Sequence, residues 1–303
     1  MNKKIPDFLF NMLNKQYGKE LTNTIIKGYT KKRPVTLRIN TLKTSVENVK
    51  CKLKEANIAF EEVVWSREAL VISSVREDEI RKLDIYHNGE IYLQSLSSML
   101  PPIVLEPKKG ESILDMAAAP GGKTTQIAAI SNNEVSITAC EMNKIRAEKL
   151  KYNIEKQGAN CVYVMVTDAR RLDNFFSFDK ILLDAPCSGS GTIDLENVDF
   201  ENGFTEKLIS KSISSQKQLL KKALKVLKPG CEMIYSTCSI LKLENEEVVK
   251  EILKRENAEI VPIDTNLFEG LPLLPVTLEG TVCVCPNELY EGFYIAKIRK
   301  IKN

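Results

Sequence analysis

The sequence predicts an α/β fold in which a doubly wound, mostly parallel sheet follows a smaller N-terminal α+β domain. From residue 111 onward, short apolar runs alternate with helix-periodic segments, the order that builds parallel sheets with helices on both faces. A turn of small residues joins the first of these runs to its helix. The first 90 residues instead show a helical stretch and a strand–helix–strand–strand pattern, which is typical of a separate α+β unit.

The composition indicates a folded protein of one large or two smaller domains. The chain has 303 residues, of which 43% are hydrophobic and 27% charged, so it can bury a sizeable core. No apolar run approaches the roughly 18 residues of a membrane span, and the N-terminus lacks the features of a secretion signal. We therefore expect a cytoplasmic protein whose eight cysteines stay reduced.

A metal site is not expected. His87 is the only histidine, which excludes multi-histidine metal sites and limits any histidine-based triad to one residue. Cys283 and Cys285 form a lone Cys-x-Cys without a second pair, a weak signal for zinc.

Positive charge is concentrated at the N-terminus. The net charge of the chain is +3, yet residues 1–54 hold thirteen Lys or Arg against three acids. The remainder is therefore mildly acidic. This asymmetry favours a polyanionic partner such as nucleic acid; a solvated lysine-rich surface is the alternative.

The first 90 residues predict a helical lead-in and a small α+β domain. Val35, Leu37 and Ile39 alternate with Arg38, as in a strand, and Ser45 is a predicted helix N-cap. In chain order we expect a helix over 5–29, a strand over 35–40, a helix over 46–56, strands near 59–64 and 69–73 and a helix over 77–83. This pattern predicts an exposed sheet face, which either binds RNA or belongs to a structural cap on the larger domain.

The second part alternates strands and helices after a linking segment at 90–105. We expect strand 111–117, helix 122–131, strand 135–140, helix 143–156, strands 161–166 and 179–184, helix 205–227, strand 231–236, helix 244–255 and a terminal strand pair at 281–285 and 292–299. Lys228-Pro229-Gly230 predicts the end of the long helix. In such sheets, ligands bind at the carboxyl ends of the strands.

Residues 112–125, SILDMAAAPGGKTT, are the central candidate for a ligand-binding turn. A small-residue turn lets a ligand approach the backbone, and the helix that opens at Lys123 offers unpaired N–H groups. The turn consists of Ala117, Ala118, Ala119, Pro120, Gly121 and Gly122. Its Gly-Lys-Thr end is similar to a phosphate-binding P-loop, although Ala117 stands where a P-loop has its first glycine. A turn without a ligand is the alternative.

Polar residues follow the other predicted strand ends. Glu141 follows the second strand, where a carboxylate can accept both hydroxyls of a ribose, and Asp168 follows the third, placed for an exocyclic amine. Asp184 ends the fourth strand, with Cys187 just beyond it, and Cys238 follows the fifth. A cysteine with a lowered pKa acts as a nucleophile at such an edge. A buried structural cysteine is the alternative for each.

Several segments resemble the motifs of one enzyme family. DMAAAPGGKTT, LLDAPCSGSGTI, YSTCSILKLENEEVV and EGFYIAKIRK are similar to motifs of the NOP/Sun-type (RsmB/NOP family) RNA cytosine-5 methyltransferases, which use S-adenosylmethionine. RPVTLRINTLKTS and IYLQSLSSMLPPIVL extend the resemblance over nearly the whole chain. The combination of Pro-Cys after the fourth strand with Thr-Cys after the fifth is highly specific.

The resemblance implies a domain division and a partner. It implies a helical lead-in at 1–30, a small RRM-like, RNA-binding-like domain at 31–90 and a Rossmann-like class I methyltransferase domain at 91–303. The partner is RNA, either tRNA or rRNA, with no metal and no membrane. We expect a monomer.

The resemblance also implies a role for each site residue. The 117–123 turn would hold the methionine part of S-adenosylmethionine, with Arg146 as a further cofactor-binding residue. Glu141 would hold the ribose, Asp168 the adenine, and Asp184 would face the target base or the cofactor near its sulfonium. Cys238 would be the nucleophile, and Cys187 would assist release of the product.

This chemistry accounts for the residue types. A thiolate that adds to carbon 6 of cytosine makes carbon 5 enamine-like, so that carbon 5 can accept a methyl group. An acid near ring nitrogen 3 stabilises the addition by sharing a proton. A base then removes the proton from carbon 5, and elimination frees the cysteine. The target base must be flipped out or single-stranded. Similar enzymes that act on DNA use the Pro-Cys cysteine as nucleophile.

The chain departs from the family pattern at two places. Cys283 stands where relatives often have a basic residue, which affects one RNA or loop contact but not the chemistry. The chain ends at Asn303 without the additional C-terminal RNA-binding domain of many bacterial relatives, and in this it is similar to compact archaeal tRNA enzymes. Its N-terminal lead-in is similar to bacterial ones.

Two other functions stay open at this point. A P-loop NTPase would use Gly122-Lys123-Thr124 and the apolar run that ends at Asp184, but it leaves Cys187 and Cys238 without a task. A non-catalytic RNA-binding assembly factor would keep the fold only to position its partner.

Overall fold

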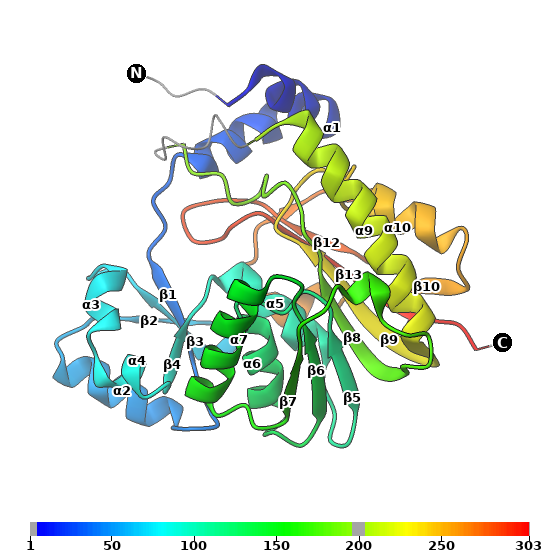
Figure 1. The fold of residues 1–303 in the computed structure, drawn as a ribbon. Helices are drawn as coiled ribbons and strands as arrows, with labels where there is room; N and C mark the ends of the chain where they lie inside the picture. Colours follow the sequence, from blue (N-terminus) through cyan, green and yellow to red (C-terminus); the bar gives the residue numbers. More distant parts are fainter. Residues whose placement is uncertain (1–4, 196–203, 303) are drawn as a thin grey trace.

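The computed structural model describes residues 5–195 and 204–302, which contain a four-stranded and a nine-stranded sheet (Figure 1). The small part consists of β1 (Val35–Ile39), α2 (Val46–Glu55), β2 (Glu61–Val63), β3 (Ser66–Ile72), α3 (Glu77–Arg81), α4 (Asp84–His87) and β4 (Ile91–Leu93). Its strands are antiparallel, in the order β2-β3-β1-β4. Ser45 caps α2 as predicted, because its side chain accepts a hydrogen bond from the N–H of Asn48.

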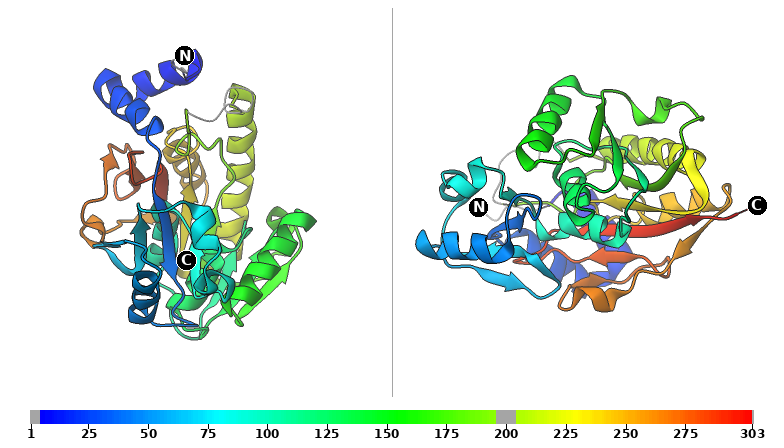
Figure 2. Two further views of the ribbon diagram at one scale, coloured as in Figure 1. Left: turned by 90° about the vertical axis from the view of Figure 1, so that its left-hand side faces the viewer. Right: turned by 90° about the horizontal axis from the view of Figure 1, so that it is seen from below.

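The prediction of an exposed sheet face in the small part is wrong. Ala69 and Val71 of β3 belong to the same buried core as α5 (Leu96–Leu105) of the large part. Arg38 is 3% exposed and donates hydrogen bonds to Gln94 Oε1 at 3.1 Å and Thr125 Oγ1 at 3.0 Å. A buried guanidinium needs acceptors, and here the large part supplies them. The small sheet therefore caps the larger domain, which was the alternative (Figure 2).

Residues 90–105, expected to link the two parts, form ordered elements of both. Tyr92 of β4 pairs with Arg38 of β1, and α5 is almost entirely buried although it contains Pro101 and Pro102. The division at 1–30, 31–90 and 91–303 stays a prediction. Because β4 completes the small sheet, we propose Leu93 as its last residue.

The large part begins with α5 and continues with β5 (Ser112–Asp115), α6 (Gly122–Ile130), β6 (Ser136–Cys140), α7 (Lys144–Gln157), β7 (Val162–Met165), η1 (Ala169–Arg171), β8 (Phe178–Asp184), α9 (Glu206–Val226), β9 (Leu227–Thr237), α10 (Glu246–Leu253), β10 (Ala258–Val261), η2 (Thr265–Phe268), β11 (Leu273–Leu274), β12 (Val282–Val284) and β13 (Phe293–Lys300). The order is β11-β12-β13-β9-β8-β5-β6-β7, with β10 paired to β13. From β9 to β7 all pairs are parallel, which confirms the doubly wound, mostly parallel sheet.

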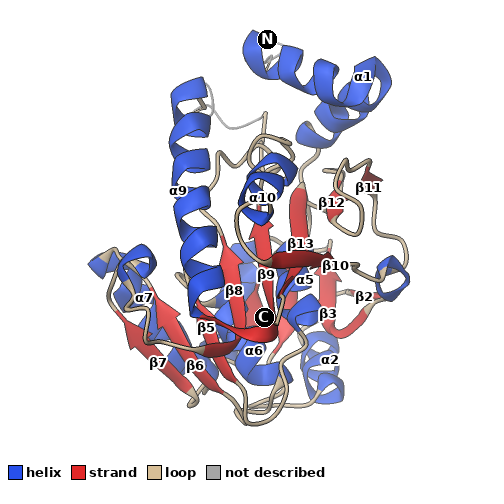
Figure 3. Ribbon diagram, turned by 90° about the vertical axis from the view of Figure 1, so that its right-hand side faces the viewer, coloured by secondary structure: helices blue, strands red, loops and turns tan. Residues whose placement is uncertain are grey.

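Two buried cores lie on opposite faces of this sheet. Ile181 and Leu183 of β8 pack in one core with α9 and α10, whereas Leu182 packs in the other with α5 and α6. Figure 3 shows α9 and α10 in front of the strands, with α5 and α6 behind them. Because both faces are covered, the central strands appear in the sequence as continuous apolar runs.

Helix α1 (Asp7–Tyr29) contacts the large part rather than extending away from it. It bends at Gly18, whose φ of +76° is strained for residues with a Cβ. The hydroxyls of Tyr17 and Tyr29 donate to the carbonyls of Ile240 and Ser190, both at 2.6 Å. These carbonyls lie in the loops that follow β9 and β8, so the predicted lead-in braces the loops at the carboxyl edge of the sheet.

Candidate active site

Cys187 and Cys238 lie together beyond the carboxyl ends of two adjacent strands. β8 and β9 are parallel, with Asp184 opposite Ser236, so the loops that follow them leave the sheet side by side. The two Sγ atoms are 3.1 Å apart, and both cysteines are free thiols. The hydrogen bond to Cys238 and burial raise the pKa of the Cys187 thiol well above its usual value. Cys187 therefore holds its proton next to the sulfur of Cys238.

A cavity of about 270 Å³, here called the thiol cavity, connects these sulfur atoms with the predicted cofactor residues. Its wall includes Glu141, Asp168, Asp184, Cys187 and Cys238. The predicted residues Ala117, Ala119 and Arg146 line it as well. Ser215 and Leu219 of α9 also line the cavity; they lie in the middle of an amphipathic helix, where no sequence pattern distinguishes them.

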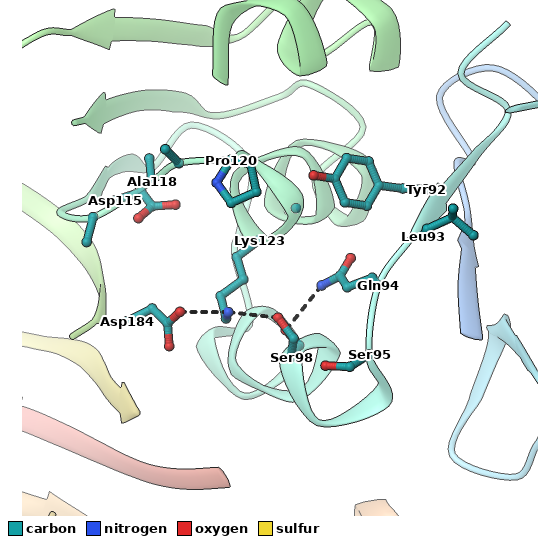
Figure 4. A pocket seen from close by; sticks show the side chains of 13 residues that line it. Tyr92, Leu93, Gln94, Ser95, Ser98, Asp115, Ala118, Pro120, Lys123 and Asp184 are labelled. Carbon is teal, nitrogen blue, oxygen red and sulfur yellow. Dashed lines mark hydrogen bonds and ion pairs between the residues drawn. The ribbon is translucent and has the colours of Figure 1, made fainter. Parts of the chain in front are cut away.

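A second cavity of about 250 Å³, here called the loop cavity, lies along the 117–123 turn. Residues of β4, of the start of α5 and of the two positions between them form one side of it, namely Tyr92, Leu93, Gln94, Ser95 and Ser98. The other side consists of Asp115, Ala117, Ala118, Ala119, Pro120, Gly122, Lys123 and Asp184 (Figure 4). Ala117, Ala119 and Asp184 line both cavities, so the two spaces adjoin at these residues.

Asp184 and Lys123 form an ion pair between the cavities. Lys123 Nζ lies 2.7 Å from Asp184 Oδ2 and donates to Ser98 Oγ at 2.7 Å (Figure 4). Ser236 Oγ donates to Asp184 Oδ1 at 2.8 Å. The lysine of a P-loop reaches for phosphates, whereas the ammonium of Lys123 is bound by a carboxylate. This geometry argues against the NTPase reading.

Gly121 and Gly122 are required for different reasons. Gly121 is the N-cap of α6 and has a φ of +111°, in the range that favours glycine. A Cβ on Gly122 would lie 3.0 Å from the ring of Tyr92, so a larger residue would press on the wall of the loop cavity. Gly121 lines neither cavity; it shapes the turn, and its contact with the cofactor stays a prediction.

Glu141 follows β6 and is 4% exposed. Its Oε1 accepts from the N–H of Asn143 at 2.8 Å, and its Oε2 lies 3.3 Å from a guanidinium nitrogen of Arg146. Arg146 also donates to the carbonyl of Ala119 at 2.8 Å. Arg146 thus ties the turn to the carboxylate of Glu141. Because a carboxylate has about four acceptor positions, Glu141 keeps capacity for a ligand.

Asp168 follows β7 and caps η1. Both of its oxygens accept hydrogen bonds from Arg170, at 2.7 to 3.1 Å. These hydrogen bonds lower the pKa of Asp168. The pair orients an ionised carboxylate at the wall of the thiol cavity, as the predicted contact with an exocyclic amine requires.

Asp115 is a candidate site residue that the sequence analysis did not single out. It ends β5, is 1% exposed and accepts from Thr124 Oγ1 at 2.7 Å through Oδ2. Its Oδ1 is buried without a hydrogen-bond partner in the described part of the chain. Burial raises the pKa of Asp115 to about 6. The sequence could have indicated Asp115, because it ends the first parallel strand. The acids at the later strand ends were selected for that reason.

The remaining predictions concern metals, membranes and Cys283. Over residues 5–195 and 204–302, no cluster of His, Cys, Asp or Glu could hold a metal ion, and no helix there combines the length and hydrophobicity needed to cross a membrane. Cys283 is 3% exposed and lies 3.8 Å from the hydroxyl of Tyr17. This position therefore packs beneath α1 instead of presenting a basic side chain.

Two family models match the two parts of the chain. The model described as 16S rRNA methyltransferase RsmB/F matches residues 102–299. The model described as Methyltr_RsmF/B-like, ferredoxin-like domain matches residues 5–77. The division between the matches falls near the junction formed by β4 and α5.

Two curated relatives differ in length. A tRNA (cytosine(49)-C(5))-methyltransferase from Pyrococcus abyssi is 38% identical over 286 residues, which cover 90% of this chain and 89% of that protein. A ribosomal RNA small subunit methyltransferase F from Shewanella sp. (strain ANA-3) is 34% identical over 276 residues, which cover 88% of this chain and 56% of that protein. The chain thus spans about half the length of the Shewanella relative.

Two solved structures from Pyrococcus horikoshii have the same fold over nearly the whole chain. A methyltransferase homolog protein has a TM-score of 0.82 and 32% identity, covering 98% of this chain and 100% of that one. A structure described as NSun6 with SFG has a TM-score of 0.87 and 26% identity, covering 100% of both chains. The family model over residues 102–299 and the relative that is 38% identical show that this chain belongs to the RsmB/F methyltransferase family.

Proposed function

We propose that this chain methylates carbon 5 of a cytosine in RNA, with S-adenosylmethionine as methyl donor and a covalent bond between Cys238 and carbon 6 of the base. The observation that supports it most directly is the 3.1 Å separation of the Cys187 and Cys238 sulfur atoms in a cavity that Glu141, Asp168 and Asp184 also line. The names of the relatives from Pyrococcus abyssi and Shewanella point to tRNA and to small-subunit rRNA, respectively.

The residues around the two cavities fit S-adenosylmethionine. Glu141 offers carboxylate capacity for ribose hydroxyls, and Asp168 offers an acceptor for the adenine amine. The unpartnered Oδ1 of Asp115 suits a positively charged or hydrogen-donating part of the cofactor, near the small-residue turn at 117–123. When bound, S-adenosylmethionine supplies a methyl group activated by a sulfonium. Arg146 supports this arrangement by holding Glu141 and the turn together.

Asp184 and Lys123 would act on the target base. The pair can hold a proton at ring nitrogen 3 while Cys238 Sγ bonds to carbon 6, because Asp184 lines both cavities and shares the thiol cavity with Cys238. This lowers the cost of the negative charge that the addition places on the ring. Ser236 and Ser98 hold the two side chains in place.

Cys187 would assist release of the methylated base. After a base removes the proton from carbon 5, the bond between carbon 6 and Cys238 Sγ breaks, and its electron pair returns to sulfur. Because its pKa is raised, Cys187 remains a thiol and can donate its hydrogen bond to that sulfur. The departing thiolate is thereby stabilised.

The basic N-terminal part supports an RNA partner. Lys15, Lys19 and Lys27 of α1 and Lys31 and Lys32 after it are exposed. We propose that they contact RNA phosphates. Binding measured at increasing salt should then weaken steeply; an affinity independent of salt would reject this contact.

We further propose that the chain acts as a monomer in the cytoplasm. The predicted catalytic and cofactor residues that line the two cavities all come from one chain, and all eight cysteines are free thiols, as suits a reducing compartment. Light scattering of the active protein at assay concentration checks the first point. A dimer under those conditions would contradict it.

The decisive experiment follows labelled methyl groups from S-adenosylmethionine into total RNA and into ribosomal subunits, with nucleoside analysis of the product. Label in 5-methylcytidine is expected, and separation of the RNA by size identifies tRNA or rRNA. Cys187→Ala should accumulate a protein–RNA adduct on a denaturing gel, whereas Cys238→Ala and the double variant should not. An adduct in the double variant would overturn Cys238 as nucleophile. If the wild type methylates none of these RNAs, the remaining hypothesis is a non-catalytic RNA-binding assembly factor.

A further inference from the structure

The carboxylate of Glu244 connects the two cysteine-bearing loops. Its Oε1 accepts from the N–H of Ser188 at 2.7 Å, and its Oε2 accepts from the hydroxyls of Ser188 and Ser239, both at 2.6 Å. Ser188 directly follows Cys187, and Ser239 directly follows Cys238. One fully buried side chain thus holds the residue next to each sulfur.

The hydrogen bonds in this network run in one direction. Ser188 Oγ accepts from the N–H of Ser190 at 3.3 Å, and Ser239 Oγ accepts from the N–H of Leu241 at 3.1 Å. Because backbone N–H groups donate to both hydroxyls, the hydroxyl protons are directed toward Glu244. A group that only accepts is required at the end of both chains of hydrogen bonds, and a carboxylate is such a group.

A glutamine in the same place would oppose this direction. Its oxygen would have to remain opposite the N–H of Ser188, which leaves its NH₂ group facing two hydroxyls that already accept other hydrogen bonds. At least one of the contacts would therefore be lost, and the spacing between Ser188 and Ser239 would change, although other hydrogen bonds keep the two loops together. The change to glutamine leaves the backbone contact of Glu244 in place, because its carbonyl accepts a hydrogen bond from Tyr235 Oη at 2.6 Å.

We propose that Glu244 is a positioning residue that sets the distance between Cys187 and Cys238. This inference rests on the proposed function, because the distance matters only if both sulfur atoms take part in one reaction. Glu244 lines neither cavity, so it acts through the two serines. Small displacements at a reacting centre cost about 10²-fold in rate per ångström, which sets the size of the expected effect.

Glu246 provides a matched control. It is 3% exposed, lies two residues further on and accepts a hydrogen bond from the N–H of Thr277 at 3.1 Å, away from both serines. Glu244→Gln and Glu246→Gln therefore make the same chemical change in the same buried segment. Only the first should alter the relation between the two sulfur atoms.

The test combines methyl-transfer kinetics with thiol cross-linking. Diamide takes up the two thiol hydrogens as the sulfur atoms join in a disulfide, and the rate of the Cys187–Cys238 link is followed by peptide mass spectrometry without RNA. Since a disulfide requires close and correctly oriented sulfur atoms, Glu244→Gln should slow this link at least about tenfold. It should lower kcat by about 10- to 100-fold with both KM values nearly unchanged. Glu246→Gln should match the wild type in both assays.

Several outcomes separate the inference from the proposed function. Cross-linking and kcat within twofold of the wild type in Glu244→Gln would overturn the positioning role, and so would equal losses in both variants. If Glu244→Gln does not fold, Ser188→Ala, which keeps the backbone hydrogen bond, should show a smaller loss of the same kind; wild-type rates there would also overturn it. If the wild type transfers no methyl group, the proposed function fails, while the cross-linking rates still decide whether Glu244 sets the distance.

Discussion

The two halves of the carboxyl edge of the large sheet use their polar groups in opposite ways. After β8 and β9, the side chains of Ser188 and Ser239 donate hydrogen bonds to Glu244, and Ser239 and Glu244 are fully buried. After β5, Asp115 Oδ1 has no partner among the described residues, although it is as deeply buried. Under the proposed function, the comparison teaches that the part of the site for covalent chemistry holds its geometry with internal hydrogen bonds, whereas the part for a reversibly bound cofactor leaves an acceptor available.

Removing the charge of Asp184, which lines both cavities, should have the largest effect on activity. Asp184→Asn keeps the shape but takes the carboxylate away from Lys123 and from the target base. We expect kcat to fall by about 10²- to 10⁴-fold, the usual contribution of a general acid or base. Single-turnover methyl transfer measures it, and in the Cys187→Ala background the adduct should form slowly. A rate within a factor of three of the wild type would show that Asp184 has no part in the chemistry.

Asp115→Asn tests whether the buried carboxyl of Asp115 has an unpartnered oxygen, through the pH dependence of the free energy of unfolding. The pKa of Asp115 is about 6 in the folded chain and about 3.9 in an unfolded one. The folded state thus binds this proton more tightly, and the contribution of Asp115 to the free energy of unfolding falls as the pH rises from about 4 to 6. At about 1.4 kcal/mol per pH unit, the loss is about 3 kcal/mol, and the asparagine variant should lack it.

Denaturant unfolding of both proteins between pH 4 and 7 measures this difference, and unfolding between pH 2 and 4 measures that of the control variant below. Asp179 is the control of opposite sign. Burial raises the pKa of its carboxyl, but hydrogen bonds from Lys228 and Ser112 outweigh this and lower the pKa to about 2. Asp179→Asn should therefore lose stability relative to the wild type as the pH rises from about 2 to 4. A difference between wild type and Asp115→Asn that does not change with pH would contradict an unpartnered, buried carboxyl.

Glu141→Ala should weaken the binding of S-adenosylmethionine while leaving the two cysteine loops after β8 and β9 unchanged. Hydrogen bonds to a charged group contribute about 1.5–3 kcal/mol, so the KM for S-adenosylmethionine should rise about 10- to 100-fold. The rate of the Cys187–Cys238 cross-link should not change. Glu148→Ala, which removes an exposed partner of Lys151 on α7, is the matched control. A normal KM in Glu141→Ala would remove Glu141 from the cofactor site.

Arg170→Ala should give the smallest effect. Its guanidinium bonds to Asp168 at the rim of the thiol cavity, where solvent screens the charges, so the change in stability should stay below about 1 kcal/mol. The pKa of Asp168 should rise, since Arg170 lowers it, and the stability difference should vanish as falling pH protonates Asp168. Carbon NMR of the carboxyl group checks the direction. An unchanged titration would show that Arg170 does not control this acid.

Local patterns were enough to place most of the candidate site. Glu141, Asp168, Asp184, Cys187 and Cys238 were selected because each follows a predicted strand, and parallel strands bring their carboxyl ends to one edge. All five line the thiol cavity. The short strands β10 and β11 were not predicted, because four and two residues are too few for a recognisable period.

Contacts between distant segments were beyond these patterns. The alternation around Arg38 correctly indicated a strand with two unlike faces, but it could not show that Gln94 and Thr125 cover the polar one. Likewise, Glu244 appeared only within a predicted helical segment and within the quoted motif YSTCSILKLENEEVV, without a role of its own. Its importance arises because β8 and β9 bring Ser188 and Ser239 together.

The sequence by itself therefore determined most of the helices and strands, the polar residues at the strand ends and the resemblance to a methyltransferase family, since these depend on residues close along the chain. Only the tertiary structure decided that the small sheet is a cap, that α1 braces the cysteine loops and that Glu244 connects Ser188 with Ser239. The physical reason is that burial and hydrogen-bond partnership belong to pairs of segments. A side chain far away in the sequence decides whether a polar group is satisfied, exposed or free to bind.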